Sequence, residues 1–138
     1  MAAQQCVGLT EKQVVVVPTA TVPQGITAMM AVDPAEEDAA VILDTMTAAA
    51  ETVTTAQITY AARNSEFDGF HIKEGDYLAL VDGKLFGTDC EIAKLLESLS
   101  DEAAERSAEF INLFYGTDVN DADAQKALAV FEHKCPNA

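Results

Sequence analysis

Basic side chains are scarce in this sequence. Eight Lys and Arg residues stand against 23 Asp and Glu residues, which gives a formal net charge of −15 over 138 residues. A field of this sign repels nucleic-acid phosphates and anionic membrane surfaces, so it disfavours both as ligands. It favours a basic protein partner, and the alternative interpretation is that the excess acid simply keeps the protein soluble.

Cysteine, signal sequences and long apolar runs are also scarce or missing. Three widely spaced cysteines do not form the pattern of a disulfide framework, and the first residues lack the basic and apolar regions of a secretion signal. The longest apolar runs are far too short to span a bilayer. We therefore expect a cytoplasmic protein without membrane insertion. Its length and its 49% of apolar residues predict one domain over residues 1–138.

The first half of the chain predicts two helices around one buried strand. Residues 1–9 have the pattern of a helix end, with Gly8 as its C-cap. The valines at 14–17 do not alternate with polar residues, which predicts a strand covered on both faces, as in a parallel sheet. The sequence Asp-Pro-Ala-Glu at 33–36 predicts a helix start. The following helix has an apolar stripe made of Ala39, Ile42, Leu43, Met46, Ala50 and Val53.

The middle of the chain predicts antiparallel strands. Residues 56–62 alternate in polarity, as expected for a half-buried strand. Asp82 and Gly83 separate two strand-like runs, residues 77–81 and 84–87, and this dipeptide is a strong hairpin signal. Residues 88–91 then have the pattern of a capping box. The helix that it opens has a stripe of Ile92, Leu95, Leu96 and Leu99.

The last third predicts a second buried strand at residues 110–115 and a helix capped by Asn120. A return strand would complete a β-α-β unit, and none follows. We interpret the chain as a piece of a longer protein; the alternative is that residues 110–115 form a sheet edge. The fold class is therefore α/β, a mixed sheet with parallel strand-helix units and a central antiparallel hairpin.

Signatures of catalysis and of cofactor binding are missing. No Gly-rich phosphate loop and no Gly-x-Gly-x-x-Gly motif occurs. His133 and Cys135 lack the second pair of ligands that a zinc site needs. His71 alternates with apolar neighbours and is interpreted as a surface histidine. We predict no catalytic residue, no metal and no cofactor in this chain.

Two positions have the pattern of a binding site. The amide of Gly25 begins an apolar stretch, so residues 21–25 are candidates for a carboxylate or anion cradle; the alternative is a tight connection between strand and helix. Arg63 ends the strand of residues 56–62, where a guanidinium can clamp a carboxylate or phosphate. The alternative for Arg63 is a structural salt bridge to a neighbouring acid.

Six motifs in order suggest a family. They are Val-Val-Pro-Thr (16–19), Val-Pro-Gln-Gly (22–25), Ile-Thr-Tyr-Ala-Ala-Arg (58–63), Phe-Asp-Gly-Phe-His-Ile-Lys-Glu-Gly-Asp-Tyr (67–77), Val-Asp-Gly-Lys (81–84) and Phe-Tyr-Gly (114–116). Their order and separations resemble the C-terminal domain of the A-type subunit of bacterial fatty acid kinase, a family also described as dihydroxyacetone-kinase-like or Dak-phosphatase-like. The resemblance spans nearly the whole chain.

This resemblance implies an ATP-dependent fatty acid kinase as the parent protein. Such relatives have an N-terminal kinase domain that binds ATP and magnesium, a middle domain, and a C-terminal domain similar to DegV-like fatty-acid-binding proteins. No ATP or magnesium ligand can be carried over to this chain, which would be a truncated DegV-like domain. The matching motifs imply that ligand or partner binding involves Thr19, Gln24, Gly25, Arg63 and Asp68.

The resemblance and the missing catalytic groups together predict a non-catalytic accessory region. It would dock a DegV-like fatty-acid-binding protein or other domains of its parent chain, and a homodimer is left open. The alternative is a small-molecule module that binds a fatty acid or an acyl phosphate near Gly25 and Arg63. A third hypothesis, an enzyme active without the rest of the parent protein, would need turnover by this chain alone.

Overall fold

A computed structural model of the chain describes residues 2–67 and 69–138. The chain divides into two compact units. The N-terminal unit extends to Thr55, and the C-terminal unit is Ala56–Ala138. The single domain over residues 1–138 stays a prediction.

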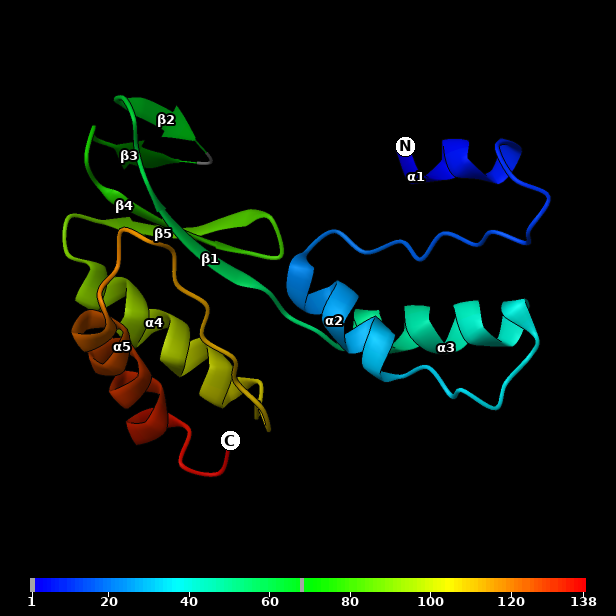
Figure 1. Ribbon diagram of the computed structural model, residues 1–138. Coiled ribbons are helices and arrows are strands. Elements are labelled where there is room, and N and C mark those ends of the chain that lie inside the picture. Colours follow the sequence, from blue (N-terminus) through cyan, green and yellow to red (C-terminus); the bar gives the residue numbers. More distant parts are fainter. Residues whose placement is uncertain (1, 68) are drawn as a thin grey trace. The chain divides into compact units, whose positions relative to one another are not determined.

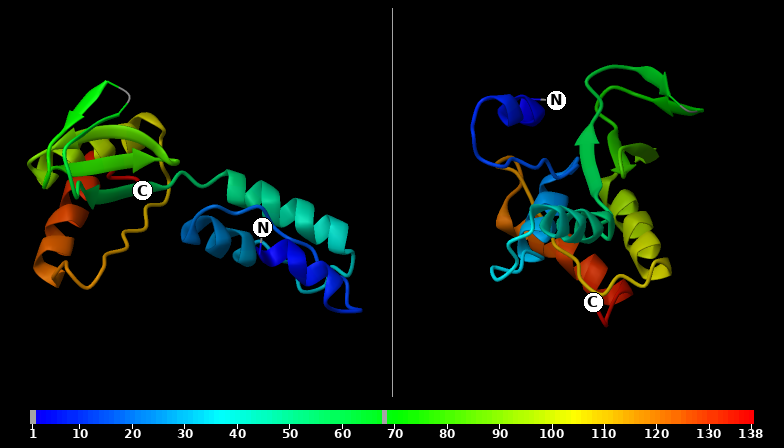
Figure 2. Two further views of the ribbon diagram at one scale, coloured as in Figure 1. Left: turned by 90° about the horizontal axis from the view of Figure 1, so that it is seen from above. Right: turned by 90° about the vertical axis from the view of Figure 1, so that its right-hand side faces the viewer.

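The N-terminal unit is a pair of helices preceded by a long irregular segment. A short helix, α1 (Ala2–Gln5), runs into the 3-10 turn η1 (Cys6–Gly8), where the sequence predicts a helix end. Helices α2 (Val22–Met30) and α3 (Ala39–Glu51) lie side by side (Figures 1 and 2). The small side chains of Ala28 and Ala50 are buried in this unit and let helix backbones approach closely.

The strand predicted at residues 14–17 is wrong. These residues belong to a segment without regular secondary structure, and Val15 is exposed. Among its described residues, the N-terminal unit forms no strand that could pair with the valines. Valine favours strands because its branched side chain packs well on the surface of a sheet. It does not form a strand where no neighbouring strand is present.

The helix start predicted at residues 33–36 is also wrong. Asp33 closes a turn instead, because its carboxylate accepts a hydrogen bond from the amide of Ala35 at 2.9 Å. Helix α3 starts after Asp38, whose carboxylate accepts from the amide of Ala40 at 2.8 Å. The predicted stripe lies on α3 except for Val53, which follows the end of the helix.

The C-terminal unit contains the larger core. Strands β1 (Ala56–Tyr60), β4 (Tyr77–Val81) and β5 (Lys84–Asp89) form an antiparallel sheet in the order β1-β4-β5. Strands β2 (Ser65–Phe67) and β3 (Phe70–Ile72) form a separate hairpin. Helix α4 (Ile92–Glu105) packs against the sheet, and α5 (Asp121–Lys134) packs against α4 (Figure 1).

One small cluster forms the centre of this core. Ala79 of β4 is completely buried between Leu95 and Leu99 of α4 and their neighbours. The half-buried side chains around the cluster are Ile58, Tyr77, Val81, Phe86 and Phe131. The predicted leucine stripe of α4 therefore faces the sheet, as its helical spacing requires.

Two local predictions in this unit are confirmed. Asp82 and Gly83 connect β4 to β5 with φ angles of 49° and 79°, which are the positive values that a tight hairpin turn demands. Asn120 caps α5, because its side-chain oxygen accepts a hydrogen bond from the amide of Asp123 at 2.9 Å.

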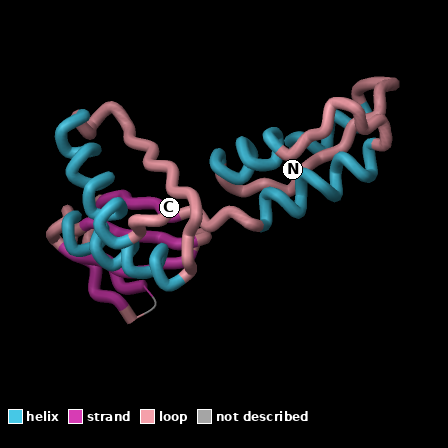
Figure 3. Tube along the Cα trace, turned by 90° about the horizontal axis from the view of Figure 1, so that it is seen from below, coloured by secondary structure: helices cyan, strands magenta, loops and turns pink. Residues whose placement is uncertain are grey.

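The predicted strand at residues 110–115 is wrong. The segment runs from α4 towards α5 as a loop without turns or bends (Figure 3). The chain is therefore α/β with antiparallel sheets, and the described residues form no parallel strand-helix unit. A parallel strand requires a neighbouring strand in the same direction, and the sequence pattern of one strand cannot supply it. No helix of the described residues is long and apolar enough to cross a membrane.

The hairpin turn predicts the effect of a side chain at Gly83. Replacing it with alanine (G83A) places a Cβ in the left-handed region and should lower the free energy of unfolding by about 1 kcal/mol. Urea denaturation measures the change. The control is G116A, because Gly116 has no positive φ and an added Cβ there meets no atom within 4 Å. Equal losses in the two variants would contradict the assignment of the strain to φ.

Candidate functional site

The predicted site residues fall into two groups. Thr19, Gln24 and Gly25 lie in the N-terminal unit, on and just before the first turns of α2. Arg63 lies in the C-terminal unit, in a bend between β1 and β2. Asp68 lies outside the described residues. The role assigned to these five residues stays a prediction.

The loop before α2 is held by a capping box. The hydroxyl of Thr21 accepts from the amide of Gln24 at 3.4 Å, and the carboxamide oxygen of Gln24 accepts from the amides of Ala20 at 2.8 Å and Thr21 at 3.3 Å. The Thr21 hydroxyl also lies 2.9 Å from that of Thr55. An anion at this helix start would have to replace the Gln24 oxygen, so the geometry fits the tight connection better than the cradle.

Thr19 lies close to Gly25 in this loop. A Cβ built on Gly25 would be 3.9 Å from the Thr19 hydroxyl, which is an ordinary contact distance. The amide of Gly25 donates to the carbonyl of Thr21 at 3.1 Å, so it is used within the helix. Thr19 and Gly25 are therefore neighbours in space. Gln24 stabilises the start of α2 through its side-chain hydrogen bonds.

Arg63 is exposed at the surface of the C-terminal unit. The six ion pairs formed by residues within 2–67 and 69–138 do not include it. The predicted salt bridge to a neighbouring acid is therefore not seen with any described acid. A planar guanidinium at this position could bind a carboxylate or phosphate through two parallel hydrogen bonds.

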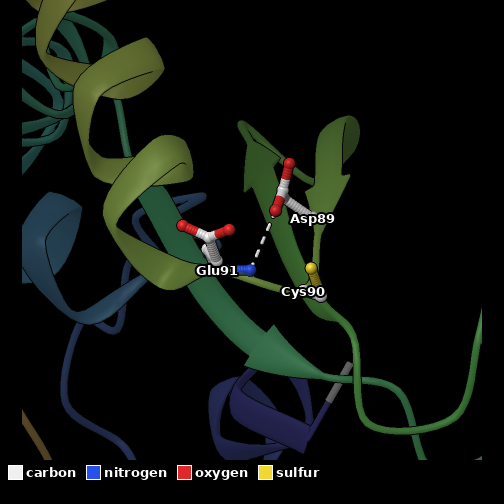
Figure 4. A group of neighbouring side chains, drawn as sticks. All are labelled: Asp89, Cys90 and Glu91. Carbon is white, nitrogen blue, oxygen red and sulfur yellow. Dashed lines mark hydrogen bonds between the residues drawn. The ribbon is translucent and has the colours of Figure 1, made fainter.

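A cluster at the start of α4 was not predicted as a site. Asp89, Cys90 and Glu91 hold their potential ligand atoms within 4.8 Å of one another (Figure 4). Lys94 already provides a positive charge, because its amine lies 3.0 Å from a Glu91 oxygen and 3.6 Å from an Asp89 oxygen. The spacing of Glu91 and Lys94, three residues apart at a helix start, is the sequence signal for this pair. The cluster is therefore an ion-paired helix start.

The capping box predicted at residues 88–91 does not form. Glu91 is the N-cap without a side-chain hydrogen bond, and Asp89 instead accepts from the Glu91 amide at 2.8 Å (Figure 4). This backbone hydrogen bond is the main cause that lowers the pKa of Asp89. The hydroxyl of Thr88 points inward, and no hydrogen-bond partner is found for it among the described residues. The reason is that β5 continues to Asp89, so Thr88 is a strand residue.

A shallow groove lies beside this cluster. It encloses about 310 Å³ and is open to solvent, with Phe70, Phe86, Leu95, Thr88, Lys94 and Ser98 among the residues along it. Its apolar side chains could contact a small hydrocarbon group. Lys94, the cation among the described residues along the groove, is paired with two carboxylates, so the groove offers little attraction to the carboxylate of a fatty acid.

The histidines lie on the surface, as the sequence predicts for His71. Its Nδ1 lies 2.6 Å from a carboxylate oxygen of Glu66, the residue opposite on the neighbouring strand. The two side chains are 83% and 74% exposed, so water screens the pair. His133 lies in the last turn of α5, where a positive charge would be favourable.

Comparisons with known proteins match the whole chain. The family model that describes the C-terminal part of A-like subunits of fatty acid kinase covers residues 1–138. Protein YloV of Bacillus subtilis is 31% identical over 134 residues, which cover 97% of this chain and 24% of that protein. An uncharacterised protein of Staphylococcus haemolyticus is 29% identical over 140 residues, which cover 99% of this chain and 25% of that protein. The chain thus spans about a quarter of the length of these relatives.

The cluster at the start of α4 predicts a dependence on pH. The pKa of Asp89 is lowered below 3.8, so its charge stabilises the fold fully above pH 3.8, and this contribution is lost as the pH falls through the lowered value. The melting temperatures of the wild type and of D89A should be measured between about pH 2 and pH 7, which spans the usual pKa of an aspartate. The two melting temperatures should converge at the acidic end of this range. D44A, which removes an exposed aspartate of α3, is the control and should melt close to the wild type throughout this pH range. A difference in melting temperature between the wild type and D89A that does not change with pH would contradict a stabilising role for the Asp89 charge.

Proposed function

Because this chain belongs to the family formed by the C-terminal regions of A-like fatty acid kinase subunits, we propose that it is a non-catalytic accessory region that docks a fatty-acid-binding protein. The partner would be a protein of the DegV-like type that presents the fatty acid to the kinase. ATP and magnesium would bind elsewhere in the parent protein, and the assembly would act in the cytoplasm. The parent chain's other domains would be additional partners.

The exposed apolar surface of α2 carries the proposal. Val22, Ile26, Met29 and Met30 are spaced by four, three and one residues, so they lie on one side of the helix. The side chains of Val22, Met29 and Met30 are 73%, 72% and 82% exposed. A soluble protein seldom leaves such a row of side chains in water unless it is an interaction surface, and methionine adapts its shape to a partner.

The electrostatics of the chain also favour a protein partner. The net charge of −15 attracts a basic surface and repels free anions, including a fatty acid or an acyl phosphate. The groove beside α4 does not overcome this repulsion, since Lys94 is already paired. Docking therefore fits the observations better than a small-molecule module does.

Docking predicts a complex that depends on α2. The chain, mixed with the fatty-acid-binding protein loaded with fatty acid, should form a complex measurable by analytical ultracentrifugation and by calorimetry. Replacing both Met29 and Met30 with glutamine (M29Q/M30Q) should weaken binding roughly tenfold, because apolar anchors at an interface dominate its affinity. T45Q, on the exposed surface of α3, is the control and should bind like the wild type. The absence of a complex at high micromolar concentration would remove the proposal.

The alternative small-molecule module predicts a different result. If the chain alone bound fatty acids or acyl phosphates, thermal-shift measurements would show stabilisation by these ligands, and R63A would abolish it. We expect no stabilisation of the wild type and no difference in R63A. Stabilisation that R63A removes would replace docking with ligand binding as the function of this region.

A further inference from the structure

The segment of residues 110–115 exposes aromatic side chains to solvent. Phe110, Phe114 and Tyr115 are 82%, 65% and 51% exposed. Ile111 and Leu113, which alternate with Phe110, Asn112 and Phe114, are half-buried. This alternation is that of a strand with one face on the protein and the other face uncovered.

The backbone of the segment is also uncovered. None of the backbone hydrogen bonds found among residues 2–67 and 69–138 uses an amide or carbonyl group of residues 110–115. The segment has neither a turn nor a bend, and it runs along the C-terminal unit as an open loop (Figure 3). Free backbone groups on an extended apolar segment resemble the edge of a sheet, which pairs readily with another strand.

Both ends of the segment are held in place. On one side, the amide of Ala108 donates to the carbonyl of Ala103 at the end of α4, at 3.0 Å. On the other side, the hydroxyl of Tyr115 donates to a carboxylate oxygen of Asp121 at the start of α5, at 3.1 Å. Because α4 and α5 pack against each other, the segment is stretched between two fixed points. A segment held in this way loses less entropy when a partner pairs with it.

Acidic side chains stand at both ends of the segment. Glu109 precedes it directly, with Glu105 one helical turn earlier, and Asp118 follows it, with Asp121 behind. The nearest basic residue in the sequence, Arg106, is paired with Glu102 at 2.6 Å. The eight residues between Glu109 and Asp118 carry no charge. A complementary strand therefore has an apolar centre and basic residues at its two ends.

We propose that residues 110–115 are a docking strand, which pairs through its backbone with an extended segment of the partner protein that has an apolar centre and basic flanks. The inference rests on the proposed function, because it names a second contact for the docked protein, in addition to the exposed surface of α2. The backbone supplies affinity, the exposed Phe110 and Phe114 contact the apolar centre, and Glu109 and Asp118 select the basic flanks.

The first test uses a synthetic peptide with the full chain. The probe is Lys-Lys-Val-Thr-Val-Ile-Val-Lys-Lys, and its control is the same peptide with glutamate in place of lysine. Fluorescence anisotropy should show binding of the lysine peptide that weakens with salt, and no binding of the glutamate peptide. Hydrogen exchange should slow at amides within residues 110–115 when the lysine peptide is added. Binding without this protection would overturn the proposal.

The second test removes the pairing ability of the backbone. Replacing Asn112 with proline (N112P) removes an exposed amide from the middle of the segment and should weaken peptide binding at least about tenfold, since proline cannot donate in a strand ladder. T117P is the matched control. The Val119 amide donates a hydrogen bond to the Gly116 carbonyl and closes a turn over residues 116–119. Thr117 is the second residue of this turn, and proline is favoured at that position. Equal peptide binding by wild type and N112P would overturn the proposal.

The third test changes the flanking charge. E109K should weaken binding of the lysine peptide roughly fivefold, the effect of losing about 1 kcal/mol of charge attraction. E74K alters the net charge equally, at an exposed residue of the β3–β4 connection, and should leave binding nearly unchanged. Equal effects of E109K and E74K would show that only net charge matters and would contradict the role of the flanks.

The fatty-acid-binding protein separates the two proposals. If it binds the wild type and N112P equally, docking stands and the docking strand is wrong. If the lysine peptide binds and protects residues 110–115 but the fatty-acid-binding protein does not bind the wild type, the proposed function is wrong and the docking strand stands with another partner protein. Protection of residues 110–115 that rises with the concentration of the chain alone would assign the strand to a second copy and overturn the proposal.

Discussion

The packing of α4 on the three-stranded sheet is the interaction on which the C-terminal unit depends. Leu95 and Leu99 contact the fully buried Ala79, where the small side chain lets helix and sheet approach closely. Gly87 on β5 also lies next to this contact, because a Cβ built there would be at an ordinary contact distance of 3.5 Å from a methyl group of Leu95. This contact positions both ends of α4, and so it also positions the ion-paired cluster at its start and the segment that follows its end.

The chain combines a strongly acidic surface with apolar side chains left in water. In an isolated protein this combination is unfavourable, since the charges repel each other and the apolar surface orders solvent without compensation. A partner with basic residues around an apolar centre would reduce the repulsion between the acidic charges and would also bury the exposed apolar side chains. The membership in a family of C-terminal regions of kinase subunits, and the relatives about four times as long, agree with a region that works with other polypeptides.

Local signals predicted the parts of this structure that depend on a few neighbouring residues. The turn at Asp82 and Gly83 was predicted because both φ angles must be positive, and the cap at Asn120 because its side chain reaches an amide three residues later. The start of α3 was predicted at the wrong residue, because Asp33 closes a turn and Asp38 caps the helix. Both aspartates accept an amide hydrogen bond from the residue two positions later, so this local signal alone does not distinguish the turn from the helix start.

The sequence alone determined the antiparallel hairpin, the apolar stripes of α3 and α4, the acidic charge and the family. The hairpin, the stripes and the charge follow from backbone sterics, from periodicity and from residues counted along the chain, whereas the family follows from the order and separations of six motifs. Only the tertiary structure decided that residues 14–17 and 110–115 are not strands, because a strand exists only where a second backbone pairs with it. It also decided that Gln24 fills the start of α2 and that Lys94 joins Asp89 and Glu91, since both depend on how side chains fold back onto the chain.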